Sequence, residues 1–364
     1  MSERKLRVGI IGIGMFAFKT HAARLKAMAN AELVAISRRS PEALAGAKEV
    51  LAVEGAYTDW RELLDHPGLE AVIVATAHRV HAEPTIAALE RGLPVLVEKP
   101  MALTSADAWA MVRAAERANR VLMVGYNRRC VGGWRAAAKA LRSGLLGTVR
   151  QLSLTVSYNL RWFWESTRMP AAIFKAVQTQ SYPPGWAEGR TDNLEGYWRC
   201  DPAQMGGGGF ADTGSHFVDL ALWLGGAPAV EVAALAASPG LAVETNLGIQ
   251  ARLANGALLS LTSADGVPAG AHHLTVYGDG GTLTVDWVKE PDMAMVVHRP
   301  QGRENLAAEI PDTNTTAAFV DTVLSGAPNL SPARDGAHAV ALSEAAYLSA
   351  AEGRIVKLEA PAEG

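Results

Sequence analysis

The stretch VGIIGIGMFA at residues 8–17 decides the fold. Its apolar start predicts a strand over residues 6–11, and the following residues fit the pattern GxGxxG/A at Gly12, Gly14 and Ala17. Gly12 permits a tight turn, Gly14 lets the backbone approach a pyrophosphate, and Ala17 lets helix and strand pack closely. Free N–H groups at the helix N-terminus would then face the phosphates. A glycine turn that binds nothing is the alternative. The residues expected to contact a dinucleotide here are Gly12, Ile13, Gly14, Met15 and Phe16.

Strand and helix patterns alternate through the first third of the chain. Almost wholly apolar runs predict strands at residues 6–11, 32–37, 71–75, 94–98 and 121–124. Ala-rich segments with helical spacing lie between several of them, at 83–91 and 106–118. This alternation predicts a Rossmann-type, doubly wound parallel sheet with helices on both faces.

The pattern changes near residue 126. After a helix at 134–143, longer alternating runs predict strands at 149–158, 229–235, 247–253, 257–263, 272–277 and 282–285. Glycine-containing turns join several of these strands, which indicates antiparallel hairpins. Helices are expected at 212–224, 314–324 and 335–351. We therefore expect a dinucleotide-binding domain at 1–126 and an α+β domain for substrate binding and oligomerisation at 127–364.

The end of the second strand bears on the choice between NAD and NADP. An acidic residue there would bind the ribose 2′-hydroxyl, whereas arginine accommodates a 2′-phosphate. The sequence reads Ser37-Arg38-Arg39-Ser40, with no carboxylate. Two guanidinium groups suit a phosphate dianion, so NADP is favoured and NAD is the alternative. A solvated basic turn remains open for Ser37, Arg38 and Arg39.

Lys99 follows a buried strand at the edge where open parallel sheets bind ligands. A desolvated lysine there could stabilise a developing alkoxide or relay a proton. An ordinary surface lysine at a strand end is the other interpretation.

Three separated motifs resemble the Gfo/Idh/MocA oxidoreductases. They are the glycine loop, the tripeptide Glu98-Lys99-Pro100, and the stretch GGGFADTGSHFVD at residues 207–219. The GYNRR segment at 125–129 also resembles the entry into that family's second domain. The resemblance implies a Rossmann domain followed by an α/β domain with a large, mostly antiparallel open sheet. It also implies a homodimer or homotetramer.

The resemblance also assigns site residues. It places Thr76, His81, Glu98, Lys99 and Asn127 at the cofactor, and Lys99 and Asn127 at the substrate as well. The chain departs from the family at Ala77-His78, where relatives often have Pro-Asn. A cofactor contact and an exposed loop histidine both remain open for His78.

Asp212 and His216 are four residues apart, so on a helix they share one face. Oxidation of an alcohol needs a base for the hydroxyl proton, and an unperturbed histidine has a suitable pKa. We expect His216 to act as general base, Lys99 to stabilise the alkoxide, and Asp212 to position the substrate, as the resemblance also implies. A core histidine that only packs is the alternative for His216. No set of residues with metal-ligand spacing is apparent, so no metal is expected.

Aromatic and arginine residues are concentrated between Tyr158 and Trp198. Aromatic faces suit the C–H face of a sugar ring, so Tyr158, Trp162 and Trp164 are candidate substrate contacts. The same composition also marks oligomer interfaces, and both interpretations stay open.

Composition narrows the class of protein. The chain has 364 residues, a net charge of −3 and 49% hydrophobic residues, which is typical of a folded soluble protein. No basic run, spanning segment or signal peptide is apparent, so neither a nucleic acid nor a membrane is expected as partner. The only two cysteines, Cys130 and Cys200, form no CxxC pair and fit a reducing cytoplasm.

The sequence therefore predicts an NAD(P)-dependent oxidoreductase acting on a CH–OH group of a sugar, cyclitol or other polyol. Three alternatives stay open: a glycosidase-like enzyme that retains NAD, a non-catalytic dinucleotide-binding regulator, and reduction of a non-carbohydrate carbonyl.

Overall fold

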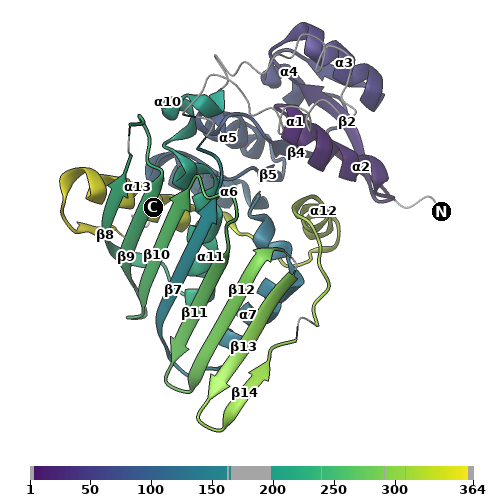
Figure 1. The fold of residues 1–364 in the computed structure, drawn as a ribbon. Coiled ribbons are helices and arrows are strands. Elements are labelled where there is room, and N and C mark those ends of the chain that lie inside the picture. The colour runs from purple at the N-terminus through teal and green to yellow at the C-terminus, as the bar shows by residue number, and fades with distance from the viewer. Residues whose placement is uncertain are drawn as a thin grey trace.

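A computed structural model of the chain contains two β-sheets with helices packed between them (Figure 1). The structure describes residues 4–161, 164, 198–238, 240–290, 292–307 and 309–359. The first sheet has six strands and the second has nine.

The six-stranded sheet is wholly parallel, as predicted. Its strands are β1 (Leu6–Ile11), β2 (Ala31–Ser37), β3 (Gly55–Tyr57), β4 (Ala71–Val74), β5 (Val95–Val97) and β6 (Leu122–Val124). Their order β3-β2-β1-β4-β5-β6 reverses direction between β1 and β4, which defines a doubly wound sheet. The helices between these strands are α1 (Met15–Ala17), η1 (Phe18–Ala22), α2 (Ala23–Ala27), α3 (Pro41–Leu51), α4 (Trp60–Leu64), η2 (His78–Val80), α5 (Ala82–Glu90) and α6 (Ser105–Ala118).

Local sequence explains these elements. The residues of β4, β5 and β6 are completely buried, because helices cover both faces of the sheet. Side-chain caps start two of the helices: Ser40 accepts a hydrogen bond from the Ala43 N–H, and Thr104 accepts one from the Asp107 N–H.

The nine-stranded sheet is mostly antiparallel, also as predicted. Its strands are β7 (Val149–Tyr158), β8 (Ala229–Ala237), β9 (Asn246–Leu253), β10 (Leu258–Asp265), β11 (His272–Gly278), β12 (Gly281–Lys289), β13 (Asp292–Arg299), β14 (Gly302–Asn305) and β15 (Val356–Lys357). Among the described strands of this sheet, only β7 and β10 pair in parallel. The predicted hairpins β9–β10 and β11–β12 are confirmed. Strands β3, β13, β14 and β15 are additional to those predicted from the sequence.

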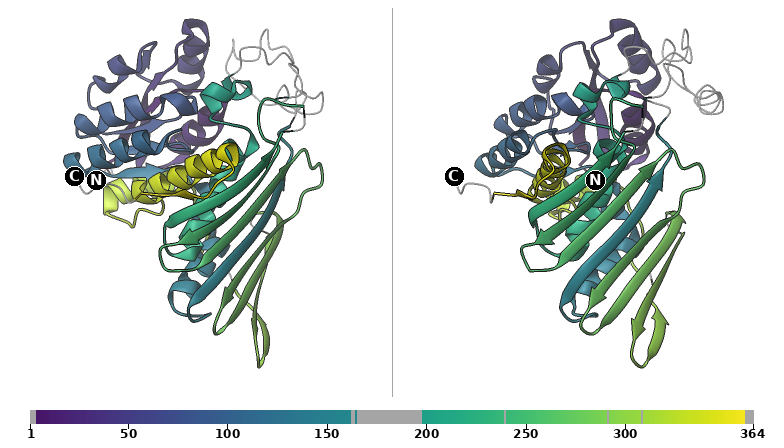
Figure 2. Two further views of the ribbon diagram at one scale, coloured as in Figure 1. Left: turned by 90° about the vertical axis from the view of Figure 1, so that its left-hand side faces the viewer. Right: turned by 60° about the vertical axis from the view of Figure 1, so that its left-hand side comes forward.

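Helices cover one face of this sheet and leave the other open (Figure 2). The helices and turns of this part are η3 (Asn127–Cys130), α7 (Gly132–Arg142), η4 (Trp198–Cys200), α10 (Pro202–Met205), η5 (Phe210–Gly214), α11 (Ser215–Gly225), α12 (Thr315–Ser325) and α13 (Ala333–Glu352). The division into units at residue 126 stays a prediction.

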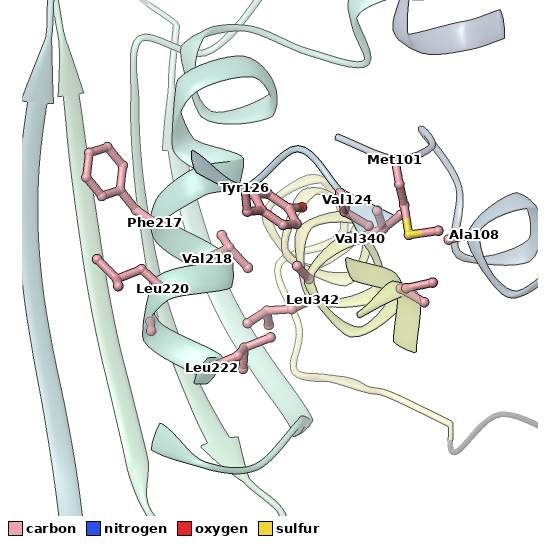
Figure 3. Packing of buried hydrophobic residues seen from close by; sticks show 14 of the residues in the cluster. Met101, Ala108, Val124, Tyr126, Phe217, Val218, Leu220, Leu222, Val340 and Leu342 are labelled. Carbon is pink, nitrogen blue, oxygen red and sulfur yellow. The ribbon is translucent and has the colours of Figure 1, made fainter. Parts of the chain in front are cut away.

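A buried apolar cluster joins the two sheets through α11 and α13 (Figure 3). Phe217 and Val218 of α11 and Leu342 of α13 belong to it, together with Tyr126 and Met101, which follow strands of the first sheet. Because these side chains are buried in one cluster, the end of the parallel sheet is packed firmly against the helix that carries His216.

Candidate active site

The predicted cofactor residues lie at one edge of the parallel sheet. The glycine loop follows β1, Ser37 ends β2, Thr76 follows β4, Lys99 follows β5 and Asn127 follows β6. These are all carboxyl ends of parallel strands, and the order reverses between β1 and β4. Ligands bind at such switch points in open α/β sheets.

The glycine loop forms a close-packed cradle. Gly12 has a φ of +86°, and a Cβ there would lie 2.7 Å from Thr76 Cγ2. The N–H groups of Gly12 and Ile13 donate to the Ser37 carbonyl at 3.1 and 2.9 Å, which ties the loop to the end of β2. At Gly14 a Cβ would meet nothing closer than 3.9 Å. The loop therefore leaves open space before a helix N-terminus, which fits a bound pyrophosphate.

The basic pair after β2 divides between two environments. The Arg38 guanidinium donates to the Ile13 carbonyl at 3.2 Å, so it lies against the glycine loop. Arg39 is exposed, and Ser37 is buried. Arg38 is thus near the place where the ribose of a dinucleotide would lie in this fold.

Glu98 is a buried carboxylate that fixes the end of β5. His21 Nε2 lies 3.0 Å from its Oε1, and the Lys99 N–H donates to its Oε2 at 3.2 Å. His21 Nδ1 in turn lies 2.9 Å from Thr316 Oγ1 at the start of α12. Burial raises the pKa of Glu98, but the hydrogen bond and charge of His21 outweigh burial and hold it below its ordinary value. Glu98 therefore orients the backbone from which Lys99 projects.

Lys99 and Asp212 form a direct pair. Lys99 Nζ donates to Asp212 Oδ1 at 2.6 Å and to the Asp212 carbonyl at 3.1 Å. Arg199 donates to the other carboxylate oxygen at 2.5 Å. Burial opposes ionisation of Asp212, but the charges of Lys99 and Arg199 prevail, so its pKa is well below the ordinary range.

His216 is the second residue of α11, which begins directly after the π-helical turn that carries Asp212. Its ring is 5.9 Å from the Tyr126 ring, and its buried Nδ1 has no hydrogen-bond partner among the described residues. Burial, with the charges of Lys99 and Arg128, holds the pKa of His216 well below its ordinary value. The expectation of an unperturbed histidine is therefore wrong, and the imidazole is neutral at pH 7.

His78 is not an exposed loop residue, which corrects one of the two interpretations. It is only 3% exposed, and its Nε2 lies 3.9 Å from Asp212 Oδ1. Its Nδ1 is 3.1 Å from the Met205 carbonyl oxygen, at the end of α10. His78 thus belongs to the group of side chains around Asp212.

The remaining predicted residues have different surroundings. His81 is buried, with ring nitrogens 2.9 Å from the Pro100 carbonyl oxygen and 3.1 Å from that of Thr76. A neutral ring donates to one of these oxygens and packs against the other strand end. Asn127 is exposed at the start of η3. Tyr158 ends β7 and lies close to Gly209, where a Cβ would be 2.4 Å from its ring. Trp164 is partly buried, and Trp162 lies outside the described residues, as does most of the aromatic segment.

Sequence reasoning missed the residues that hold the π-helical turn. Glu244, in the loop before β9, accepts hydrogen bonds from the N–H groups of Gly208 and Phe210 and from the Tyr347 hydroxyl. Burial raises the pKa of Glu244 in spite of these bonds. No local pattern marks Glu244, because its partners come from distant parts of the chain. Arg199 directly follows the aromatic segment and was not among the predicted site residues.

The described residues show neither a metal-binding cluster nor a membrane-spanning helix. No cluster of three or more histidine, cysteine, aspartate or glutamate side chains there could hold a metal ion. Within the same ranges, no helix combines the length and apolar character needed to cross a membrane.

Two family models match the chain, and together they span more than half of it. Residues 6–126 match the oxidoreductase family with an NAD-binding Rossmann fold, and residues 174–284 match the GFO/IDH/MocA C-terminal domain. The chain belongs to the Gfo/Idh/MocA oxidoreductase family.

Members of this family resemble the chain over its whole length. Myo-inositol 2-dehydrogenase from Thermotoga maritima is 28% identical, over 97% of this chain and 99% of that protein. D-apiose dehydrogenase from Paraburkholderia graminis is 27% identical, over 99% and 92%. The crystal structure of aldose-aldose oxidoreductase from Caulobacter crescentus, complexed with glycerol, is 26% identical, with a TM-score of 0.77 over 98% of this chain and 100% of that one. These relatives support an oxidoreductase with a nicotinamide dinucleotide as cofactor.

Proposed function

We propose that this Gfo/Idh/MocA protein transfers a hydride between a nicotinamide dinucleotide and a carbon of a sugar, cyclitol or related polyol. The observation that carries the proposal is the meeting of Lys99 and Asp212, with His216 close by, at the edge that also carries the glycine loop. The relatives named dehydrogenases of myo-inositol and D-apiose support the substrate class.

The glycine loop, Arg38 and Thr76 are the residues proposed to hold the dinucleotide, which when bound supplies the hydride acceptor or donor. Lys99 then acts on the substrate oxygen. The Lys99 side chain is 13% exposed and its ammonium is fixed by Asp212, so it can stabilise negative charge on that oxygen with little reorganisation.

His216 is proposed to move the hydroxyl proton. Because its pKa is held low, the imidazole is neutral and has a lone pair available at pH 7. In the oxidative direction it accepts the proton at a ring nitrogen, and in the reductive direction the imidazolium returns it.

Asp212 is proposed to bind substrate hydroxyl groups. Its two oxygens are occupied by Lys99 and Arg199. Each carboxylate oxygen can accept more than one hydrogen bond, so a polyol can join the network without displacing both cations.

NADP is the proposed cofactor, on the position of Arg38 against the glycine loop. A homodimer or homotetramer and a cytoplasmic location stay predictions.

The first test measures NADPH and NADH binding by energy transfer from tryptophan. Turnover of a panel of sugars and polyols, including myo-inositol and D-apiose, is then measured as the change in absorbance at the nicotinamide band. Net conversion of the added cofactor from its oxidised to its reduced form, or the reverse, with one of these sugars supports the proposal. Tight cofactor binding without net turnover contradicts it; glycoside cleavage would then indicate the glycosidase-like enzyme, and no reaction would indicate a regulator.

A further inference from the structure

His78 occupies a fixed place between the cofactor edge and Asp212. It begins η2, two residues after Thr76, which packs on the glycine loop. Its ring packs edge-on against Trp198 at 4.8 Å and lies 5.7 Å from the ring of His81. The ring of His81 is itself held between two backbone carbonyl oxygens, at 2.9 and 3.1 Å from its nitrogens. These contacts leave the imidazole of His78 little freedom to rotate.

The hydrogen bond at Nδ1 decides which nitrogen carries the proton. The Met205 carbonyl oxygen, 3.1 Å away, can only accept, so Nδ1 must donate. Burial, together with the charges of Lys99 and Arg199, outweighs the charge of Asp212 and keeps the pKa of His78 well below its ordinary value. The ring is therefore neutral, and Nε2 bears a lone pair and no hydrogen.

Nε2 faces another acceptor. Asp212 Oδ1 lies 3.9 Å away, and no described residue donates a hydrogen bond to Nε2. Two acceptors that face each other across this distance, away from bulk water, repel unless a donor enters between them. Hydroxyl groups are the donors that fit here, with oxygens about 2.8 Å from their acceptors.

We propose that His78 Nε2 accepts a hydrogen bond from a substrate hydroxyl adjacent to the one bound by Asp212, so that His78 is a specificity-determining residue that selects a vicinal diol. A vicinal diol presents two neighbouring O–H donors, one for each acceptor, and every hydroxyl group carries a single hydrogen. This inference rests on the proposed function, because the diol belongs to the same sugar or polyol.

Two isosteric variants separate the roles of the two nitrogens. His78→Asn keeps a donor where Nδ1 is and removes the Nε2 acceptor, whereas His78→Gln supplies an amide oxygen where Nε2 is. With the panel sugar that wild type turns over best, His78→Asn should lower kcat/KM by about tenfold or more, mainly through KM. His78→Gln should retain most of it. NADPH and NADH binding should be unchanged in both variants.

Monodeoxy analogues of that sugar identify the hydroxyl. One analogue should lose about tenfold in wild type and little further in His78→Asn, because the same hydrogen bond is missing in both cases. His338→Asn, at a half-buried histidine that packs on Trp109, is the matched control and should behave as wild type. Equal impairment by Asn and Gln, or no effect of Asn, would overturn the proposal.

Nitrogen NMR of the ¹⁵N-histidine-labelled protein tests the proposal without turnover. The signals of His78 are assigned by their loss in His78→Asn. At pH 7.5 they should show a protonated Nδ1 and an unprotonated Nε2. The chemical shift of Nε2 alone should change when a panel sugar is added with cofactor. A protonated Nε2, or no shift with any sugar, overturns the assignment. If no sugar is turned over, the proposed function fails, and the spectra still decide whether Nε2 accepts a hydroxyl.

Discussion

Asp212 is the side chain on which the candidate site depends, since one carboxylate holds Lys99 on one oxygen and Arg199 on the other. Its exposed fraction is only 3%, so neither cation pairs with it through water. An uncompensated charge at this depth would cost several kcal/mol and would raise the pKa of Asp212, but the charges of Lys99 and Arg199 outweigh burial and hold that pKa low. The cations are thereby positioned before a substrate arrives.

Substitution of Lys99 or His216 should abolish chemistry and spare cofactor binding. Lys99→Met removes the charge that faces the substrate oxygen, and His216→Gln removes the base, so each should lower kcat by about 10²–10⁴-fold. Fluorescence titration with NADPH should give an unchanged Kd. Lys48→Met, on the exposed surface of α3, is the control. Near-normal turnover in both site variants would show that the roles are misassigned.

Arg38→Ala should change the preference between the two dinucleotides. Loss of a charge-assisted contact to a 2′-phosphate should weaken NADPH binding by about tenfold or more, whereas NADH should lose much less. The ratio of the two dissociation constants is the quantity to measure, with Arg91→Ala, at the exposed C-terminal end of α5, as the control. Equal losses for both cofactors would remove the reason to prefer NADP.

At the level of elements, the π-helical turn η5 and helix α11 place Asp212 and His216 together. A Cβ at Gly208 would lie 2.4 Å from the Glu244 carbonyl oxygen, so the backbone of the turn is in direct contact with the loop before β9. The Glu244 carboxylate accepts three donors of this region. The loop before β9 thus fixes the position of the turn. This keeps the side chains of Asp212 and His216 in place relative to Lys99.

Glu244→Gln should loosen this turn. An amide cannot accept all the bonds that the carboxylate accepts, and its NH₂ would face backbone donors, so we expect about 1–3 kcal/mol lower stability. Turnover should fall further than cofactor affinity, because Asp212 and His216 are no longer held in place relative to Lys99. Urea unfolding and steady-state kinetics measure the two effects. Tyr347→Phe removes a single donor and should have the smaller effect; the reverse ranking would contradict this role for Glu244.

Patterns within short windows predicted much of this element structure. The strand at residues 149–158 was predicted to the residue, because its faces alternate between core and solvent. β14, by contrast, is exposed on every residue and has no apolar period to detect. The burial of His78 and the hydrogen bonds of Glu244 were not predicted either, because the residues that contact these two side chains are distant in sequence. Motif spacing predicted Lys99, Asp212 and His216, and their catalytic roles stay predictions.

At the scale of the whole molecule, Arg129 links the parallel sheet to the helical layer. It follows β6, is 2% exposed, and donates to Asp219 of α11 through two nitrogens at 2.9 and 2.7 Å. A third nitrogen reaches Asp335 of α13 at 2.6 Å. One guanidinium therefore joins elements from both halves of the chain, and its planar geometry suits the bidentate bond.

Arg129→Met should destabilise the whole protein by about 3–5 kcal/mol, because it leaves Asp219 buried without its partner. The free energy of unfolding in urea, followed by tryptophan fluorescence, measures this loss. The double variant Arg129→Met/Asp219→Leu should recover much of it, since no unpaired charge remains. If the double variant is as unstable as the single one, the loss comes from packing and not from the buried charge.

The buried histidines make stability depend on pH. His78, His81 and His216 have pKa values lowered by burial from the ordinary 6.5. Below pH 6.5 the unfolded chain binds protons that the native protein excludes, so each histidine lowers the free energy of unfolding by up to about 1.4 kcal/mol per pH unit as the pH falls. Above pH 6.5 neither state binds these protons, and the contribution is constant.

Buried carboxyls with raised pKa values, such as Asp219 and Glu244, oppose the histidines, because the native protein binds their protons more tightly than the unfolded chain does. The histidine contribution is therefore measured as a difference between two proteins. Between pH 6.5 and 5.5, the unfolding free energy of His216→Gln should fall less steeply than that of wild type, by up to about 1.4 kcal/mol per pH unit. His338→Asn removes a half-buried histidine and should give a smaller change in slope. Parallel curves for wild type and His216→Gln would mean that His216 is protonated in the native protein, which would also remove it as the base of the proposed reaction.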